Sequence, residues 1–155
     1  TMVKPEVLKK LEFFKGFTEG EIKVFSERLI IEEFESGHDI FHENQIGDDS
    51  MFIIIEGAIK ISKKQKNAEK ILANMKDGEF FGEMSMLYPA PRSASAVTIK
   101  PSKMIRFSDR DYNSFKKDHP DIVVKLNEIF IKILVQRLRE ADKRLVKEGL
   151  GIGAL

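Results

Sequence analysis

The segment at residues 80–96 reads FFGEMSMLYPAPRSASA and differs in character from the sequence on either side of it. Gly82 lets the backbone approach a ligand closely, and the residues after it can form one turn of helix whose free N–H groups point at an anion. Arg92 stands nine positions after Glu83 and carries a planar guanidinium that suits two oxygens of a phosphate. Ser93 and Ala94 are small and leave their amides accessible. The segment predicts a phosphate site, at which Glu83 is free to accept a hydrogen bond from a sugar hydroxyl.

Short stretches rich in Ile and Phe surround this segment. They are separated by single glycines, namely Gly37, Gly47, Gly57, Gly78 and Gly82. Ile59 and Ile61 alternate with polar residues, as in a half-buried strand, whereas Met51–Ile55 is continuously apolar and is expected to be buried on both faces. This pattern predicts many short strands and an antiparallel β-roll, in a fold of the mainly β or α+β class.

Helices are expected before and after the roll. The first spans Lys4–Phe14, and the second begins at Thr18, which has capping-box spacing to Glu21. After the roll, Asp109 is expected to cap a short helix, and Pro120 opens a long one. We divide the single expected domain, residues 1–155, into N-terminal helices at about 3–28, the roll at about 29–108 with its phosphate segment at 81–95, C-terminal helices at about 109–148, and a flexible tail at 149–155.

The long final helix carries an apolar stripe that drifts around its axis. Its members are Ile122, Leu126, Ile129, Ile133, Leu134, Leu138, Ala141 and Leu145. Two interpretations are open: the whole stripe covers the roll, or its second half serves as a ligand lid and the seam of a homodimer.

The composition limits the class of protein. A chain of 155 residues with 42% hydrophobic residues suits one domain with a core, and a formal charge of +1 does not indicate nucleic acid or a membrane surface as the partner. The absence of cysteine excludes disulfides and thiol chemistry and is compatible with a reducing compartment. No apolar run approaches the ~20 residues that span a bilayer, and no signal peptide is evident. We expect a soluble cytoplasmic protein.

The phosphate segment resembles the phosphate-binding cassette of the cyclic-nucleotide-binding domain family, which includes the ligand domain of the catabolite activator protein and the regulatory subunit of cyclic-AMP-dependent protein kinase. The matching residues are Phe81, Gly82, Glu83, Leu87, Pro91, Arg92, Ser93, Ala94 and Ser95. The resemblance extends over almost the whole chain, and the long final helix corresponds to the family's lid helix.

The resemblance implies a role for each matching residue. Glu83 would bind the ribose 2′-hydroxyl and Arg92 the cyclic phosphate, with a hydroxyl from Ser93. Further contacts to the phosphate would come from the backbone amides of Gly82, Met84, Ser85 and Ala94. The base would rest against Ile61, Leu72 and Phe81, approached from the lid helix by Arg137, Ala141 or Asp142.

Two positions depart from the family pattern. Asn44 aligns with a turn glycine, and Asn tolerates left-handed geometry. Ala141 aligns with a residue that offers a hydroxyl to adenine in the catabolite activator protein, and its side chain cannot do so. Asp142 could accept hydrogen bonds from guanine. We rank cyclic AMP first as ligand, with cyclic GMP or a cyclic dinucleotide left open and no other cofactor.

Other polar patterns are weaker. His38 and His42 would lie about 13 Å apart on one strand, too far to share one metal ion. No pair of nucleophile and base indicates an enzyme. The basic residues of the last helix (Arg137, Arg139, Lys143, Arg144 and Lys147) are expected to be its solvated face, and the chain ends before a helix-turn-helix domain could form, so no DNA binding by this chain alone is expected.

Our leading hypothesis is a cyclic-nucleotide sensor that transmits occupancy through its final helix to a partner not identified by the sequence. The alternative is a degenerate, ligand-free β-roll that serves interaction or dimerisation.

Overall fold

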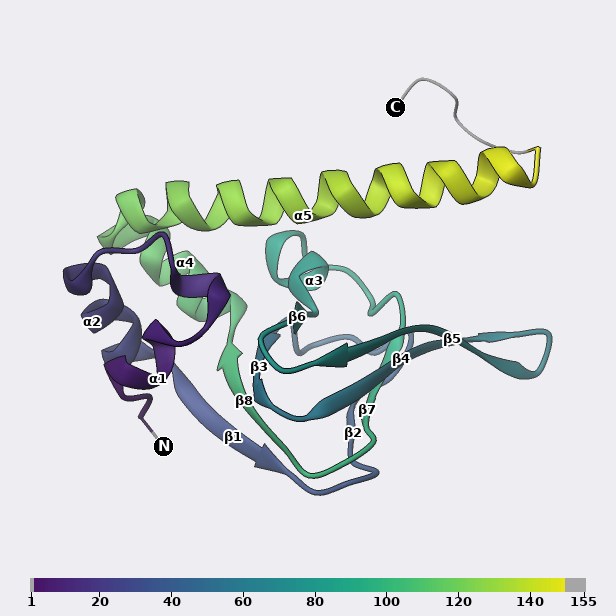
Figure 1. Ribbon diagram of the computed structural model, residues 1–155, viewed down its shortest axis with the longest axis horizontal. Helices are drawn as coiled ribbons and strands as arrows, with labels where there is room; N and C mark the ends of the chain where they lie inside the picture. Colours follow the sequence, from purple (N-terminus) through teal and green to yellow (C-terminus); the bar gives the residue numbers. More distant parts are fainter. Residues whose placement is uncertain (1, 150–155) are drawn as a thin grey trace.

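A computed structural model describes residues 2–149 of the chain, which form two antiparallel sheets flanked by helices (Figure 1). One sheet has the strand order β1-β8-β3-β6, with β1 at Ile30–Phe34, β8 at Ser102–Phe107, β3 at Met51–Glu56 and β6 at Phe80–Phe81. The other has the order β2-β7-β4-β5, with β2 at Asp39–Phe41, β7 at Ser95–Thr98, β4 at Ala58–Gln65 and β5 at Ala68–Lys76. All strand pairs are antiparallel, and the predicted β-roll is confirmed.

Strand β3 lies between two hydrophobic cores, which explains its continuous apolar sequence. Phe52 and Ile54 belong to the core between the two sheets, whereas Met51 and Ile53 belong to the core under the helices. The prediction that this run is buried on both faces is confirmed from Met51 to Ile54, and Ile55 is only partly buried.

The helices cover the outer face of the first sheet. They are α1 at Pro5–Lys9, the 3₁₀ turn η1 at Glu12–Phe14, α2 at Glu19–Arg28, α4 at Asp109–Asp118 and α5 at Pro120–Lys147. Phe25 of α2, Phe115 of α4 and Phe130 of α5 are buried in the same cluster as Ile105 and Phe107 of β8. This layer therefore fixes the start of α5 against the roll.

Two predicted helix boundaries were wrong. The expected helix at Lys4–Phe14 is interrupted, because Leu11 is extended and the chain turns there so that Phe13 and Phe14 enter the core. The cap of α4 is Ser108 rather than Asp109. Its hydroxyl accepts from Asp111 N at 3.0 Å, while the Asp111 carboxylate accepts from Ser108 N at 3.2 Å.

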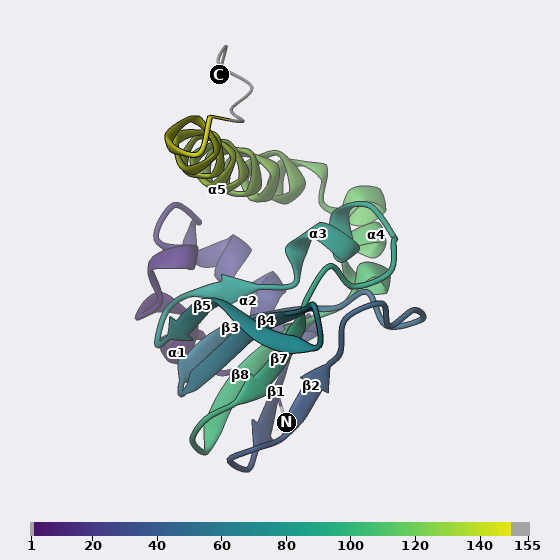
Figure 2. The ribbon, with the colours of Figure 1, turned by 90° about the vertical axis from the view of Figure 1, so that its right-hand side faces the viewer.

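Helix α5 runs for 28 residues along one side of the molecule, above α4 and the short helix α3 at Glu83–Leu87 (Figures 1 and 2). Its first half buries Ile122, Leu126 and Phe130. Its second half leaves large apolar side chains exposed. Of the tail predicted at 149–155, only Gly149 falls within the described residues. No helix among residues 2–149 is both long and apolar enough to cross a membrane.

Candidate nucleotide-binding site

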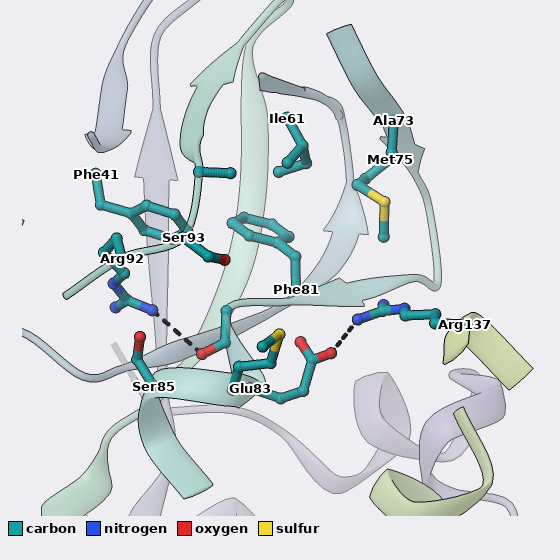
Figure 3. A pocket seen from close by; sticks show the side chains of 13 residues that line it. Phe41, Ile61, Ala73, Met75, Phe81, Glu83, Ser85, Arg92, Ser93 and Arg137 are labelled. Carbon is teal, nitrogen blue, oxygen red and sulfur yellow. Dashed lines mark hydrogen bonds and ion pairs between the residues drawn. The ribbon is translucent and has the colours of Figure 1, made fainter. Parts of the chain in front are cut away.

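A cavity of about 220 Å³ lies between the β4-β5 hairpin, the short helix α3 (Glu83–Leu87) and α5 (Figure 3). Its lining residues are Phe41, Ile61, Ala73, Met75, Phe81, Gly82, Glu83, Met84, Ser85, Arg92, Ser93, Ala94 and Arg137. Apolar side chains form one wall of the cavity, and the polar groups of the phosphate segment form the opposite wall. Such a cavity suits a ligand with one apolar and one anionic end.

The structure brings together most of the residues proposed from the sequence. Those that line the cavity are Ile61, Phe81, Gly82, Glu83, Met84, Ser85, Arg92, Ser93, Ala94 and Arg137. Three others do not line it: Leu72, Ala141 and Asp142. Arg137 is the residue of α5 that lines the cavity. Ala141 and Asp142 lie more than one helical turn beyond it; Ala141 is exposed and Asp142 is buried.

Leu72 lies outside the cavity because of the register of its strand. Ile61 of β4 pairs with Ala73, but the next residue pairs with Ile71, so Leu72 falls in a bulge and is 44% exposed. Ala73 and Met75 line the cavity in its place. These two residues and Phe41 were not predicted from the sequence. The alternation of Ala73 and Met75 indicates that both side chains point to the same face of β5. Which face that is depends on the bulge at Leu72.

Gly82 joins β6 to α3 in a conformation that favours glycine. Its φ is +83°, and a Cβ atom there would lie 3.0 Å from the Ser50 carbonyl oxygen and 3.1 Å from Arg92 Nη1. The backbone must therefore approach Arg92 closely. The one-turn helix predicted after this glycine is confirmed as α3.

Arg92 is a buried cation held by neutral groups. It is 2% exposed; its Nη2 donates to the Ser50 carbonyl at 2.7 Å, its Nη1 donates to the Gly82 carbonyl at 3.2 Å, and the guanidinium carbon lies 4.0 Å from the centre of the Phe41 ring (Figure 3). Within residues 2–149, its Nε–H has no hydrogen-bond acceptor and no carboxylate approaches within 4 Å. Burial lowers the pKa of Arg92, and the nearby charges of Asp48 and Asp49 partly oppose this shift.

This environment is unfavourable for an isolated charge and favourable for a bound anion. A buried cation needs a compensating charge, and an anion in the cavity would supply it.

The loop of Asn44 holds the backbone of Arg92, because Asn44 N donates to the Arg92 carbonyl at 2.8 Å and Arg92 N donates to the Gln45 carbonyl at 2.9 Å. Asn44 has a φ of +70°, which confirms the left-handed turn predicted there.

Glu83 is the second charged group of the cavity, and it contacts the lid helix. Its side chain is 1% exposed, and Arg137 Nη1 donates to its Oε1 (Figure 3). Arg137 Nη2 also donates to the Phe80 carbonyl at 3.4 Å. The carboxylate that the resemblance assigns to a ribose is thus paired with a residue of α5.

Comparison with known proteins agrees with this geometry. The family model described as "Cyclic nucleotide-binding domain" matches residues 31–119, more than half of the chain. The chain belongs to the cyclic nucleotide-binding domain family. The match includes the whole phosphate-binding cassette, with Gly82, Glu83 and Arg92.

Individual relatives of this family resemble the chain along most of its length. A CRP-like cAMP-activated global transcriptional regulator of Mycobacterium tuberculosis is 30% identical over 141 residues, which are 90% of this chain and 61% of the regulator. The structure of the Thermus thermophilus catabolite activator protein is 26% identical, with a TM-score of 0.78, over 88% of this chain and 62% of that one. A cyclic nucleotide-binding domain from Methylobacillus flagellatus is 24% identical, with a TM-score of 0.80, over 94% of this chain and 82% of that one. The chain spans about three fifths of the length of the first two relatives.

Proposed function

We propose that this domain binds a cyclic nucleotide monophosphate in the cavity and signals its presence through α5. The observation that carries the proposal is Arg92, a buried cation at the cavity wall whose Nε–H has no acceptor within the described residues. The cyclic phosphate would pair with Arg92 and accept hydrogen bonds from Ser93 and the amides of Gly82, Met84, Ser85 and Ala94. The proposal is one of binding, not of catalysis.

The base would occupy the apolar wall formed by Ile61, Ala73, Met75 and Phe81. These side chains would pack against the face of a purine and make no hydrogen bond to its polar edge. They therefore do not distinguish adenine from guanine. We rank cyclic AMP before cyclic GMP, as the M. tuberculosis regulator is named for activation by cAMP.

Helix α5 would report occupancy through Arg137. A ribose 2′-hydroxyl that donates to Glu83 competes for, or joins, the hydrogen bond that Arg137 makes to the same carboxylate. A ligand shifts a conformational equilibrium only by its difference in affinity for the two states. Contacts at Glu83 and Arg137 are therefore where binding would be converted into a change at α5.

We propose that the exposed apolar residues of α5 pair with a second copy of the chain, and that the signal passes to an effector that the sequence does not identify. We also propose a cytoplasmic location, because the chain lacks cysteine. The basic residues Arg139, Lys143, Arg144 and Lys147 are exposed on α5. We propose that they are solvated and that residues 2–149 do not bind DNA by themselves.

Calorimetric titration with cyclic AMP, cyclic GMP and 5′-AMP tests the proposal. We expect micromolar or tighter binding of a cyclic nucleotide, with a loss of about 10- to 100-fold in Arg92→Ala, the range for charge-assisted hydrogen bonds. Arg110→Ala removes an exposed arginine of α4 and should bind like the wild type. A folded protein that gives no heat with any of the three compounds would overturn the proposal and favour the ligand-free interaction module.

A further inference from the structure

A cluster of charged side chains lies behind Arg92, outside the lining of the cavity. Its centre is Arg106 of β8. Arg106 Nε lies 2.7 Å from Glu32 Oε1, an ion-pair contact whose N–H is not aligned for a hydrogen bond, and Arg106 Nη2 donates to Glu32 Oε2 at 3.3 Å. Arg106 Nη1 lies 3.3 Å from Asp48 Oδ2. One guanidinium therefore joins a carboxylate of β1 to a carboxylate of the loop before β3.

Ser50 connects this cluster to Arg92. Arg106 Nη1 donates to Ser50 Oγ at 3.3 Å, and Ser50 N donates to Asp48 Oδ1 at 3.1 Å. The carbonyl of the same serine accepts the shorter of the two hydrogen bonds made by the Arg92 guanidinium, at 2.7 Å. Ser50 is 2% exposed. Arg106 therefore contacts the Ser50 hydroxyl directly and the Ser50 N–H through Asp48, on the residue whose carbonyl holds Arg92.

The charges of the cluster also matter for Arg92. Burial raises the pKa of Asp48, whereas hydrogen bonds with Ser50 and then the charges of Arg106 and Arg92 lower it, so both arginines act on this carboxylate. Of these two arginines, Arg106 alone lies within 4 Å of the Asp48 carboxylate, as an ion pair at 3.3 Å. The Asp48 charge is thus largely compensated by Arg106, and the Arg92 guanidinium is left for another anion.

We infer that Arg106 is a positioning residue for Arg92: it holds Asp48 and Ser50 in place and keeps Asp48 from pairing with Arg92. Its effect on ligand affinity rests on the function proposed above, whereas its effect on Arg92 does not. Removal of the Arg106 charge would free Asp48 to pair with Arg92, and a bound phosphate would then compete with an internal carboxylate.

The binding test uses Arg106→Gln, Asp48→Asn and the double variant, each titrated with cyclic AMP. We expect Arg106→Gln to bind about tenfold more weakly, corresponding to about 1.4 kcal/mol. Asp48→Asn alone should stay within about threefold of the wild type, and its addition to Arg106→Gln should restore most of the affinity. Arg110→Gln is the matched control for the loss of a positive charge.

A second measurement needs no nucleotide. The Nε–Hε resonance of Arg92, observed by NMR in ¹⁵N-arginine-labelled protein and assigned with Arg92→Lys, should shift in Arg106→Gln and return in the double variant. If Arg106→Gln does not fold, Arg106→Met replaces it in both measurements, because methionine also removes the charge and every contact to Glu32, Asp48 and Ser50 while keeping an unbranched side chain.

The outcomes separate the two proposals. An Arg92 resonance that shifts and is restored supports the inference even if the wild type binds no nucleotide, in which case only the proposed function fails. An unchanged Arg92 resonance in folded Arg106→Gln would overturn the inference. So would an Asp48→Asn substitution that raises affinity equally in both backgrounds, since independent long-range charges would then explain the data.

Discussion

Arg137 of α5 and Glu83 of α3 are 54 residues apart in the sequence and form an ion pair at the cavity. The Glu83 side chain is almost fully buried, whereas Arg137 is 39% exposed. The pair therefore lies where the interior of the roll meets the solvent-facing lid. Any ligand that reaches Glu83 meets a carboxylate already in contact with α5.

Arg137→Ala removes this contact and leaves a buried carboxylate without the guanidinium. A buried charged group that loses one hydrogen-bond partner costs about 1–3 kcal/mol, so we expect the free energy of unfolding to fall by about that amount. Chemical denaturation at pH 7 measures it. Arg139→Ala, on the exposed face of the same helix, is the control and should change stability by less than about 0.5 kcal/mol. Equal stabilities for the two variants would contradict the structural role of the pair.

A comparison of Gly82→Ala with Gly78→Ala distinguishes two effects of the new methyl group at Gly82: strain in the backbone and a steric clash with Arg92. The two glycines have φ values of +83° and +85°, so alanine should cost about 1–2 kcal/mol at either position. At Gly78 the new methyl group meets nothing within 4 Å, whereas at Gly82 it presses on the Ser50 carbonyl and Arg92 Nη1. We expect both variants to lose stability and only Gly82→Ala to lose nucleotide binding. Calorimetry of the two folded variants checks this, and equal affinities would show that Arg92 tolerates the displacement.

Much of this site could be predicted from the sequence because its residues are close together in the chain. Gly82, Glu83 and Arg92 belong to one local segment and line one cavity, and the chemistry of each residue type indicated the role proposed for it. The remaining features of the site depend on contacts between segments that are far apart in the sequence. The bulge that removes Leu72 from the cavity depends on how β4 and β5 pair. Where α5 crosses the roll decides that Arg137, and not Ala141 or Asp142, lines the cavity. Neither is encoded in a local pattern.

The Asp48 carboxylate should contribute to stability in a pH-dependent way. Burial raises its pKa, but hydrogen bonds from Ser50 and the charges of Arg106 and Arg92 together lower it below the ordinary value of 3.8. A lowered pKa means that the folded state binds the proton less tightly than the unfolded state. The stabilisation is therefore present above about pH 3.8 and is lost as the pH falls through the lower pKa of the folded state.

Asp48→Asn tests this linkage. We expect the variant to be less stable than the wild type at pH 7 and the difference to shrink as the pH is lowered from about 5 to 3. Urea denaturation at several pH values measures it. Asp49→Asn removes the same charge one residue away and serves as the control. A stability difference for Asp48→Asn that stays constant over this pH range would show that its carboxylate does not titrate differently in the folded state.

The exposed face of α5 provides the last prediction, because apolar side chains recur along it at a regular spacing. Val124, Ile131, Leu138 and Leu145 follow one another at intervals of seven residues and are 59%, 61%, 49% and 37% exposed. A seven-residue apolar repeat on a helix is typical of a coiled-coil seam, and pairing with a second copy would bury it. We expect a dimer in sedimentation equilibrium and a folded monomer when Leu138 and Leu145 are both changed to Glu. Lys143→Glu, between them in sequence, should remain dimeric. A wild-type chain that is monomeric at several hundred micromolar would overturn the proposed seam, and the exposed stripe would then need a different partner.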